Sequence, residues 1–253
     1  MSSPLSIINY QRPVEFRMGD VLVKSWNVLT RHFQTFVLIV GLAQVPTLVA
    51  SAFLIPNVTA RTGFSLSAWL IFMGVLFLQL FVSALAEASV VFGAFQDLRG
   101  KTVSAQESFA RGLARFLPVV VLSLLMGLAV GFGLILCLVP GVLALAAFRV
   151  ALPTCVVERL GPIQSISRSV DLTRGHWWPI LGVLFALFLV NLAVAAALRA
   201  ALPLQPALPY TLASWIWTVI TTSCGAVFTA ILYHDLRAVN EGIGIEEIAA
   251  VFD

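Results

Sequence analysis

The chain has 253 residues, of which 60% are hydrophobic and 11% are charged, whereas soluble domains average about 25% charged residues. A soluble fold of this length cannot hide so much apolar surface, so the soluble classes are excluded and lipid must solvate much of the chain. The net charge of +3 is too small to indicate a nucleic-acid-binding surface. We therefore expect an all-α membrane protein that binds no nucleic acid.

Six apolar stretches follow one another along the chain, at 34–55, 66–95, 117–139, 141–157, 177–198 and 210–233. Most of them reach the roughly 20 residues that a helix needs to cross the hydrocarbon core. Of the 15 Lys and Arg residues, 12 lie before the first stretch or after an even-numbered one, and only Arg61 and Arg199 lie in the other connections. Because basic residues collect on the cytoplasmic side, both termini are predicted in the cytoplasm.

An amphipathic segment precedes each pair of apolar stretches, at 20–32, 104–115 and 162–175. Each segment carries large apolar side chains at helical spacing, such as Leu22 and Trp26 in the first. Such stripes are typical of helices that lie in the membrane interface with their basic residues toward the lipid head groups. We assign the following residues to the cytoplasmic interface: Arg31, Arg115, Arg174, His176, His234 and Asp235.

Short sequence motifs also recur along the chain, and this recurrence predicts a threefold internal repeat. KSWNVLTRHF at 24–33 and RSVDLTRGHW at 168–177 share a basic-Ser start and a Thr-Arg pair followed by His and an aromatic residue. FQDLRG and YHDLRA, after the second and sixth stretches, both contain Asp-Leu-Arg. We therefore expect one membrane domain of three parallel hairpin repeats with a short cytoplasmic tail, in chain order 17–99, 103–158, 162–237 and 238–253.

The connections on the outer side are short, and Pro140-Gly141 is expected to be a bare turn between the third and fourth stretches. On the third stretch, the Gly127-xxx-Gly131 pattern would permit close contact with another helix. In the tail, apolar residues recur at helical spacing beside acidic ones, which fits either a short helix against the basic cytoplasmic face or a frayed end. The apolar residues of the tail are Ile245, Ile248 and Phe252.

Glu87 and Arg149 are the only charged residues deep inside the apolar stretches, where an ionisable side chain is costly enough to suggest a function. Glu87 lies ten residues before Asp97, and Arg149 lies nine residues before Glu158, so both are about 13–15 Å from the cytoplasmic ends of their helices. Opposite charges at one depth are expected to pair within salt-bridge reach. The pattern fits either a structural ion pair or a transport or proton-relay site.

Other polar residues are expected at a similar depth, and Gln44, Thr222 and Ser223 could line a polar cavity around the pair. Hydroxyl groups in membrane helices also bond to their own backbone or to a neighbouring helix, and we favour this packing role for them. Asn191 lies deeper in the fifth stretch and is expected to make one interhelical hydrogen bond. The three histidines lie at cytoplasmic helix ends, and their spacing matches no metal-ligand motif, so we expect interfacial anchoring.

The second half of the chain carries the most specific motifs. They are the Pro140-Gly141 pair, Ala-Leu-Pro at 151–153 before a Val-Val-Glu that ends at Glu158, and Arg-Ser-x-x-Leu-Thr-x-Gly-His over 168–176. With these residues the chain resembles the YciC-like bacterial inner-membrane proteins and the related glycerophosphoryl diester phosphodiesterase membrane-domain family. The resemblance implies a polytopic inner-membrane protein. We expect no hydrolase activity from it, because this chain has no room for the soluble catalytic barrel.

Three function classes remain open. The first is a non-enzymatic membrane protein that acts in the lipid phase, by binding a lipid or another amphiphile, by organising the membrane or by assembling a partner complex. The second is a small transporter or channel with a polar path around Glu87 and Arg149. The third is an intramembrane enzyme, for which no nucleophile, base and orienting residue can be assembled. We expect the first class, with membrane lipids as partners, other membrane proteins or a second copy of the chain as alternatives, and no catalytic residue, cofactor or metal.

Overall fold

The computed structural model describes residues 16–54, 65–98, 100, 104–202 and 207–241, and the regular structure in these parts is helical. Six stretches of helix in them are long and apolar enough to cross a membrane. These stretches are Phe33–Phe53, Leu66–Leu98, Phe116–Leu136, Leu138–Val157, Trp177–Ala201 and Leu208–Glu241. The predicted all-α class, with six helices of this length and composition, is confirmed.

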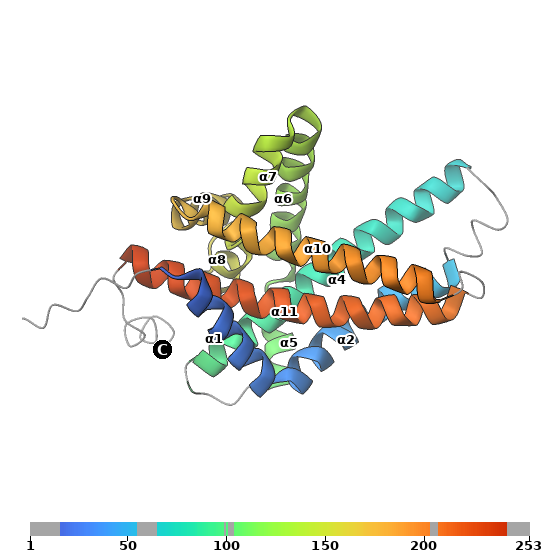
Figure 1. Ribbon diagram of the computed structural model, residues 1–253, viewed down its shortest axis with the longest axis horizontal. Helices are drawn as coiled ribbons and strands as arrows, with labels where there is room; N and C mark the ends of the chain where they lie inside the picture. The colour runs from blue at the N-terminus through green and yellow to red at the C-terminus, as the bar shows by residue number, and fades with distance from the viewer. Residues whose placement is uncertain (1–15, 55–64, 99, 101–103, 203–206, 242–253) are drawn as a thin grey trace, which may run out of the picture.

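Four long helices organise the fold (Figure 1). They are α2 (Phe33–Val49) with its π-helical end η1 (Ala50–Leu54), α4 (Leu66–Leu98), α10 (Trp177–Ala201) and α11 (Ala207–Glu241). Helices α2 and α4 pack against each other and on α11, while α10 runs beside α11. The buried residues of α4 lie between Ala84 and Gln96, where small residues such as the fully buried Ala86 and Ala88 permit close helix contact. The packed core therefore includes the part of α4 that carries Glu87.

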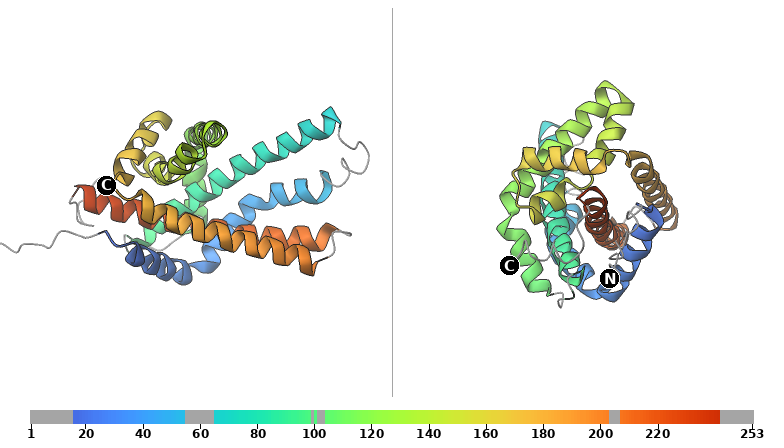
Figure 2. Two further views of the ribbon diagram at one scale, coloured as in Figure 1. Left: turned by 45° about the horizontal axis from the view of Figure 1, so that its top comes forward. Right: turned by 90° about the vertical axis from the view of Figure 1, so that its left-hand side faces the viewer.

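A hairpin of α6 (Phe116–Leu136) and α7 (Leu138–Ala147) stands at a steep angle to these four helices (Figures 1 and 2). The chain turns at Cys137, and Pro140-Gly141 lies inside the first turn of α7, so the prediction of a bare turn at Pro140-Gly141 is wrong. Pro140 is tolerated there because the N–H groups in the first turn of a helix have no intrahelical partner.

Glycines determine how closely α6 and α7 approach each other. A Cβ on Gly133 of α6 would lie 2.9 Å from the Cα of Gly141 in α7, so a larger residue does not fit without a shift. Gly127 and Gly131 do not make this contact, because nothing lies within 4 Å of a Cβ built on either residue. The described helices therefore do not use the close contact that this pattern would permit, and both glycines line an open groove instead.

The fourth predicted span is interrupted near its middle. Helix α7 ends at Ala147, and a separate short helix, α8 (Ala151–Val157), begins after three intervening residues. Pro153 explains the break, because in a continuous helix its ring would clash with the carbonyl of Arg149, four residues earlier. The expectation of one continuous helix over 141–157 is thus wrong, and Arg149 lies in the interruption.

The break leaves the carbonyl of Ala147 without its usual helical partner, and α9 (Pro162–Thr173) supplies a replacement. Ser169 and Thr173 of α9 donate hydroxyl hydrogen bonds to this oxygen, at 2.6 and 3.3 Å. Thr154 of α8 donates to the backbone oxygen of Ser165 in α9 at 3.1 Å. The Ser and Thr of the Arg-Ser-x-x-Leu-Thr motif therefore stabilise the interruption between α7 and α8.

Removing both hydroxyls at the break should destabilise the protein by more than the sum of the single changes. Ser169→Ala or Thr173→Val leaves one donor on Ala147, so each should cost about 1 kcal/mol, whereas the double variant leaves a buried carbonyl unpaired and should cost about 3 kcal/mol. The measurement is the free energy of unfolding in mixed detergent micelles. Ser167→Ala, at an exposed position of α9, is the matched control and should change it by less than about 0.5 kcal/mol. Simple additivity of the two single losses would contradict the shared capping role.

Helices α1 (Met18–Arg31), α5 (Ala105–Ala114) and α9 coincide with the three segments that carry amphipathic patterns. Helix α1 packs on α11 and α5 packs on α4. The buried face of α5 is narrow and consists of two small residues, Ser108 and Gly112, which pack against α4. Several large apolar side chains of the three segments remain exposed, among them Leu22, Trp26, Leu113 and Ile163, whereas Leu29 and Leu172 are buried. The exposed side chains are therefore available to lipid.

Two predictions on the ends and loops lie outside the described residues. They concern the tail with Ile245, Ile248 and Phe252, and the outer connection that contains Arg61. Arg199, the other basic residue assigned to the outer side, lies in the last turn of α10, and its Nε donates to Tyr210 Oη of α11 at 3.4 Å. This bond joins the two helices at the end that carries the α10–α11 connection.

Candidate functional site

The structure brings Glu87 and Arg149 together. Glu87 lies on α4 between two fully buried alanines, and Arg149 lies in the break between α7 and α8. Arg149 Nη1 is 3.9 Å from Glu87 Oε1, within reach of an ion pair but too long for a direct hydrogen bond. About a quarter of each side chain is exposed, 26% for Glu87 and 24% for Arg149. The pair therefore borders an opening and does not lie in a dry core.

Arg149 also contacts α11. Its Nη2 donates a hydrogen bond to the backbone oxygen of Gly225 at 3.1 Å. A Cβ at Gly225 would lie 3.4 Å from the same nitrogen, so the guanidinium packs directly on the backbone of α11. The Nε–H of Arg149 is buried and has no hydrogen-bond partner in the described parts of the chain. One guanidinium group thus joins α4, the α7–α8 break and α11, and it retains an unpaired donor.

A groove of about 430 Å³ opens beside the pair, between α4 and the α6–α7 hairpin. Its polar lining comes from Glu87 and Ser83 of α4, from Ser123 of α6 and from Arg149. The rest of the lining is apolar or glycine: Leu80, Ala84, Met126, Gly127, Val130, Gly131, Leu145, Phe148 and Leu152. A mostly apolar cleft with a few convergent polar groups is typical of small-molecule sites.

Gln44, one member of the predicted polar layer, reaches the groove indirectly. It is fully buried on α2, and its Nε2 donates to Ser83 Oγ at 3.3 Å. Gln79 of α4 donates to the same hydroxyl at 2.9 Å and to Gln44 Oε1 at 3.3 Å. Gln44 and Gln79 also line a second pocket, of about 210 Å³, between α2, α4 and α11. Ser83 therefore links this second pocket to the groove, one helical turn from Glu87.

The other predicted members of the polar layer form no hydrogen bond with the pair among the described residues. Ser223 donates to the backbone of Val219 in its own helix, which is the packing role favoured for it. Thr222 is half-buried on the same helix. Asn191 accepts a hydrogen bond from Trp217 Nε1 at 3.0 Å, and this bond between α10 and α11 is the interhelical contact expected of it.

The two Asp-Leu-Arg motifs hold α1 in place, a role that their repetition in the sequence did not reveal. Asp97 Oδ1, near the end of α4, lies 2.8 Å from His32 Nε2 and 3.5 Å from Arg31 Nη1. Asp235 of α11 accepts hydrogen bonds from Lys24 Nζ on both oxygens, at 2.8 and 3.0 Å. The two aspartates therefore fix α1 across the ends of α4 and α11.

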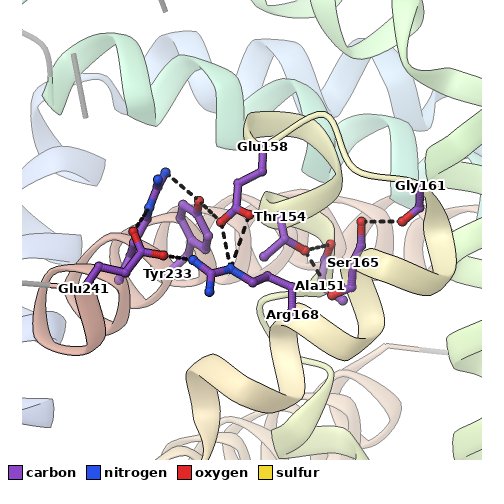
Figure 3. A network of polar contacts seen from close by, with 9 residues as sticks. Ala151, Thr154, Glu158, Gly161, Ser165, Arg168, Tyr233 and Glu241 are labelled. Atoms are coloured by element: carbon purple, nitrogen blue, oxygen red, sulfur yellow. Dashed lines mark hydrogen bonds and ion pairs between the residues drawn. The ribbon is translucent and has the colours of Figure 1, made fainter. Parts of the chain in front are cut away.

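A second polar network ties α8, α9 and α11 together (Figure 3). Tyr233 Oη donates to Glu158 Oε1 at 2.7 Å, and Arg168 Nε donates to both oxygens of Glu158 at 3.3 and 3.4 Å. Arg168 also pairs with Glu241, which accepts a hydrogen bond from Arg237. The spacing of i, i+4 and i+8 places Tyr233, Arg237 and Glu241 on one face of α11, and this is the signal that could have identified them from the sequence.

The remaining residues assigned to the interface differ in their contacts. His176 meets Phe16 edge-on with ring centroids 4.5 Å apart, and its Nδ1 is buried without a partner among the described residues. His234 Nδ1 lies 3.1 Å from the carboxylate of the next residue. Arg174 is exposed, and Arg115 is half-buried directly before α6. Within the part of the chain that the structure describes, no group of three or more His, Cys, Asp or Glu side chains could hold a metal ion.

Comparison of the chain with protein-family models, with curated proteins and with solved structures gives no match. The functional conclusion therefore depends on the geometry of the groove, the ion pair and the exposed apolar surface.

Proposed function

We propose that this chain is a non-enzymatic integral membrane protein of the bacterial inner membrane, and that it binds a lipid or another amphiphile in the groove between α4 and the α6–α7 hairpin. The observation that carries the proposal is the position of an ion pair, Glu87 with Arg149, on the wall of an open and mostly apolar groove between helices that are apolar enough to cross a membrane. Charged side chains inside a membrane are costly, so they are retained where they bind or move something.

The chemistry of the groove suits an amphiphile. Arg149 Nη1 would bind an anionic or polar head group, and Glu87 would accept a hydrogen bond from a hydroxyl or amine on it. Met126, Val130 and Leu145 would contact an alkyl chain. The volume of about 430 Å³ falls within the range of roughly 300–1,000 Å³ that is usual for ligand pockets. A head group with the first part of one chain fits this space.

The orientation in the membrane is part of the proposal. Helices α1, α5 and α9 would lie along the cytoplasmic interface, because large side chains such as Trp26 and Ile163 are exposed and would enter lipid. Each of these helices would then lead one of three parallel hairpin repeats, with both termini in the cytoplasm, as the distribution of the basic residues predicts. A reporter fused after Asp253 that is active only in the periplasm would contradict this orientation.

Filling the groove tests the proposed binding. Gly127→Trp would place an indole in the groove, since nothing lies within 4 Å of a Cβ at this position. We expect this variant to fold and to lose most of the lipid that the wild-type protein retains after purification, as measured by native mass spectrometry.

Gly182→Trp is the matched control, because its Cβ position on α10 is equally open but lies outside the groove. This control should retain as much lipid as the wild-type protein. Equal retention by Gly127→Trp and Gly182→Trp would contradict binding in the groove.

A small transporter is the second candidate function. Its support is Ser83, which connects the groove with the polar pocket that contains Gln44. A continuous aqueous path would expose this residue, so Ser83→Cys in a Cys137→Ser background should then react with a water-soluble thiol reagent in vesicles. Lipid binding without transport predicts no reaction from either side.

A further inference from the structure

A separate pocket of about 350 Å³ lies between α4, α5 and the end of α8. It is lined by three arginines, Arg111, Arg115 and Arg159, and by one acidic residue, Glu107. None of its residues lines the groove beside the intramembrane pair. The pocket is therefore a distinct concave surface with an excess of positive charge.

The charged side chains of this pocket differ in whether they have a hydrogen-bond or ion-pair partner. Glu107 accepts a hydrogen bond from Gln96 Nε2 at 3.0 Å and lies 3.9 Å from Arg111. The guanidinium of Arg111 is in turn held 5.7 Å from the centre of the Phe92 ring. Arg115 and Arg159 form no ion pair or side-chain hydrogen bond with the described residues. Two guanidinium groups of the pocket thus have donors available to an anion.

The backbone at Arg159 gives a second reason to assign a role to this side chain. Arg159 directly follows Glu158, the C-cap of α8, and has a φ of 57°. Glycine, or less often asparagine, is the usual residue at this left-handed position after a helix, because a side chain with a Cβ is disfavoured there. An arginine at this position costs stability, and such a cost is typical of residues retained for binding.

The position of the pocket relative to the membrane indicates its ligand. Arg115 directly precedes α6 and Arg159 follows the C-cap residue of α8, which places both at the predicted cytoplasmic interface. Phe92 of α4 and Val156 of α8 supply an apolar wall beside them. We infer that this pocket binds a phosphate group, because guanidinium groups match phosphate oxygens in geometry and charge and basic pockets between membrane helices suit anionic head groups. The phosphate is carried either by an anionic phospholipid or by a small soluble molecule.

Removal of the two unpaired arginines tests the site. The probes are dihexanoyl phosphatidylglycerol and inorganic phosphate, titrated into the purified full-length protein in a non-ionic detergent. Whichever of the two probes the wild-type protein binds, the double variant Arg115→Gln/Arg159→Asn should bind it at least tenfold more weakly than the wild-type protein does. Arg174→Gln is the matched control, because Arg174 is exposed on the same predicted face but lies outside the pocket, and it should change the affinity less than twofold.

Further variants separate binding from folding and from the groove. Asparagine fits the left-handed backbone, so Arg159→Asn alone should weaken binding without lowering the melting temperature. Glu107→Gln removes the one acidic group and should tighten binding, and Gly127→Trp should leave binding of these probes unchanged.

The outcomes distinguish the two sources of phosphate. Binding of phosphatidylglycerol without competition by inorganic phosphate assigns the site to a lipid head group, and effective competition assigns it to a soluble phosphate. Wild-type affinity in the Arg115→Gln/Arg159→Asn variant, or no binding of either probe to the wild-type protein, would overturn the inference.

Discussion

Arg149→Met and Glu87→Gln should each destabilise the protein by about 3 kcal/mol, because each change leaves one charge of the intramembrane pair without its partner. The effect lies at the lower end of the range for buried ion pairs, since about a quarter of each side chain is exposed. The double variant should be more stable than the sum of the two single losses predicts, by at least about 1 kcal/mol. The measurement is the free energy of unfolding in mixed detergent micelles at constant pH.

Arg174→Met is the matched control for the loss of a positive charge, because Arg174 is exposed. It should change the free energy of unfolding by less than about 0.5 kcal/mol. If the losses from Arg149→Met and Glu87→Gln simply add, the two side chains are not coupled. The double variant also separates folding from function, because it should fold and yet retain less lipid than the wild-type protein.

Glu158→Ala should also destabilise the protein by about 3 kcal/mol, because it removes the carboxylate that Tyr233 and Arg168 share and leaves the guanidinium of Arg168 with Glu241 alone. Tyr233→Phe removes one hydrogen bond of this network and should cost about 1 kcal/mol. Both values can be measured by the same unfolding experiment. The predicted order of the losses follows from the number of contacts that each change removes.

The control for this network is Asp171→Ala, since Asp171 is an exposed acidic residue on the same helix as Arg168. Its effect should stay within about 0.5 kcal/mol. A Glu158→Ala variant as stable as Asp171→Ala would show that the network does not hold α8, α9 and α11 together.

The pairing of Glu87 with Arg149 could be predicted because the two residues lie at similar distances along the chain from Asp97 and Glu158, and the structure brings them within 3.9 Å of each other. Counting 1.5 Å per residue assumes a continuous helix, which is correct for α4 but not for the fourth span. The break lies at Arg149 itself, so the segment counted from there to Glu158 consists mostly of α8. Pro153 explains the location of the break, but the prediction used hydropathy alone and so missed it.

The contacts that stabilise the break could not be predicted from local patterns. Ser169 bonds to the carbonyl of Ala147, 22 residues earlier, and Arg149 bonds to that of Gly225, 76 residues later. Backbone acceptors of this kind have no sequence signature. The steep angle of the α6–α7 hairpin (Figure 2) could not be predicted from the sequence either. The hydropathy of a helix indicates that it prefers lipid, but it does not determine the angle at which the helix crosses its neighbours.

The most direct test of the groove as a binding site is a density map of the protein in lipid nanodiscs by electron cryo-microscopy. Binding in the groove predicts an elongated density along α6, past Gly127 and Gly131, with its polar end within about 4 Å of the guanidinium of Arg149. The proposal is contradicted if side chains close the groove, or if the groove is open but holds no ordered density while lipids are resolved elsewhere around the protein.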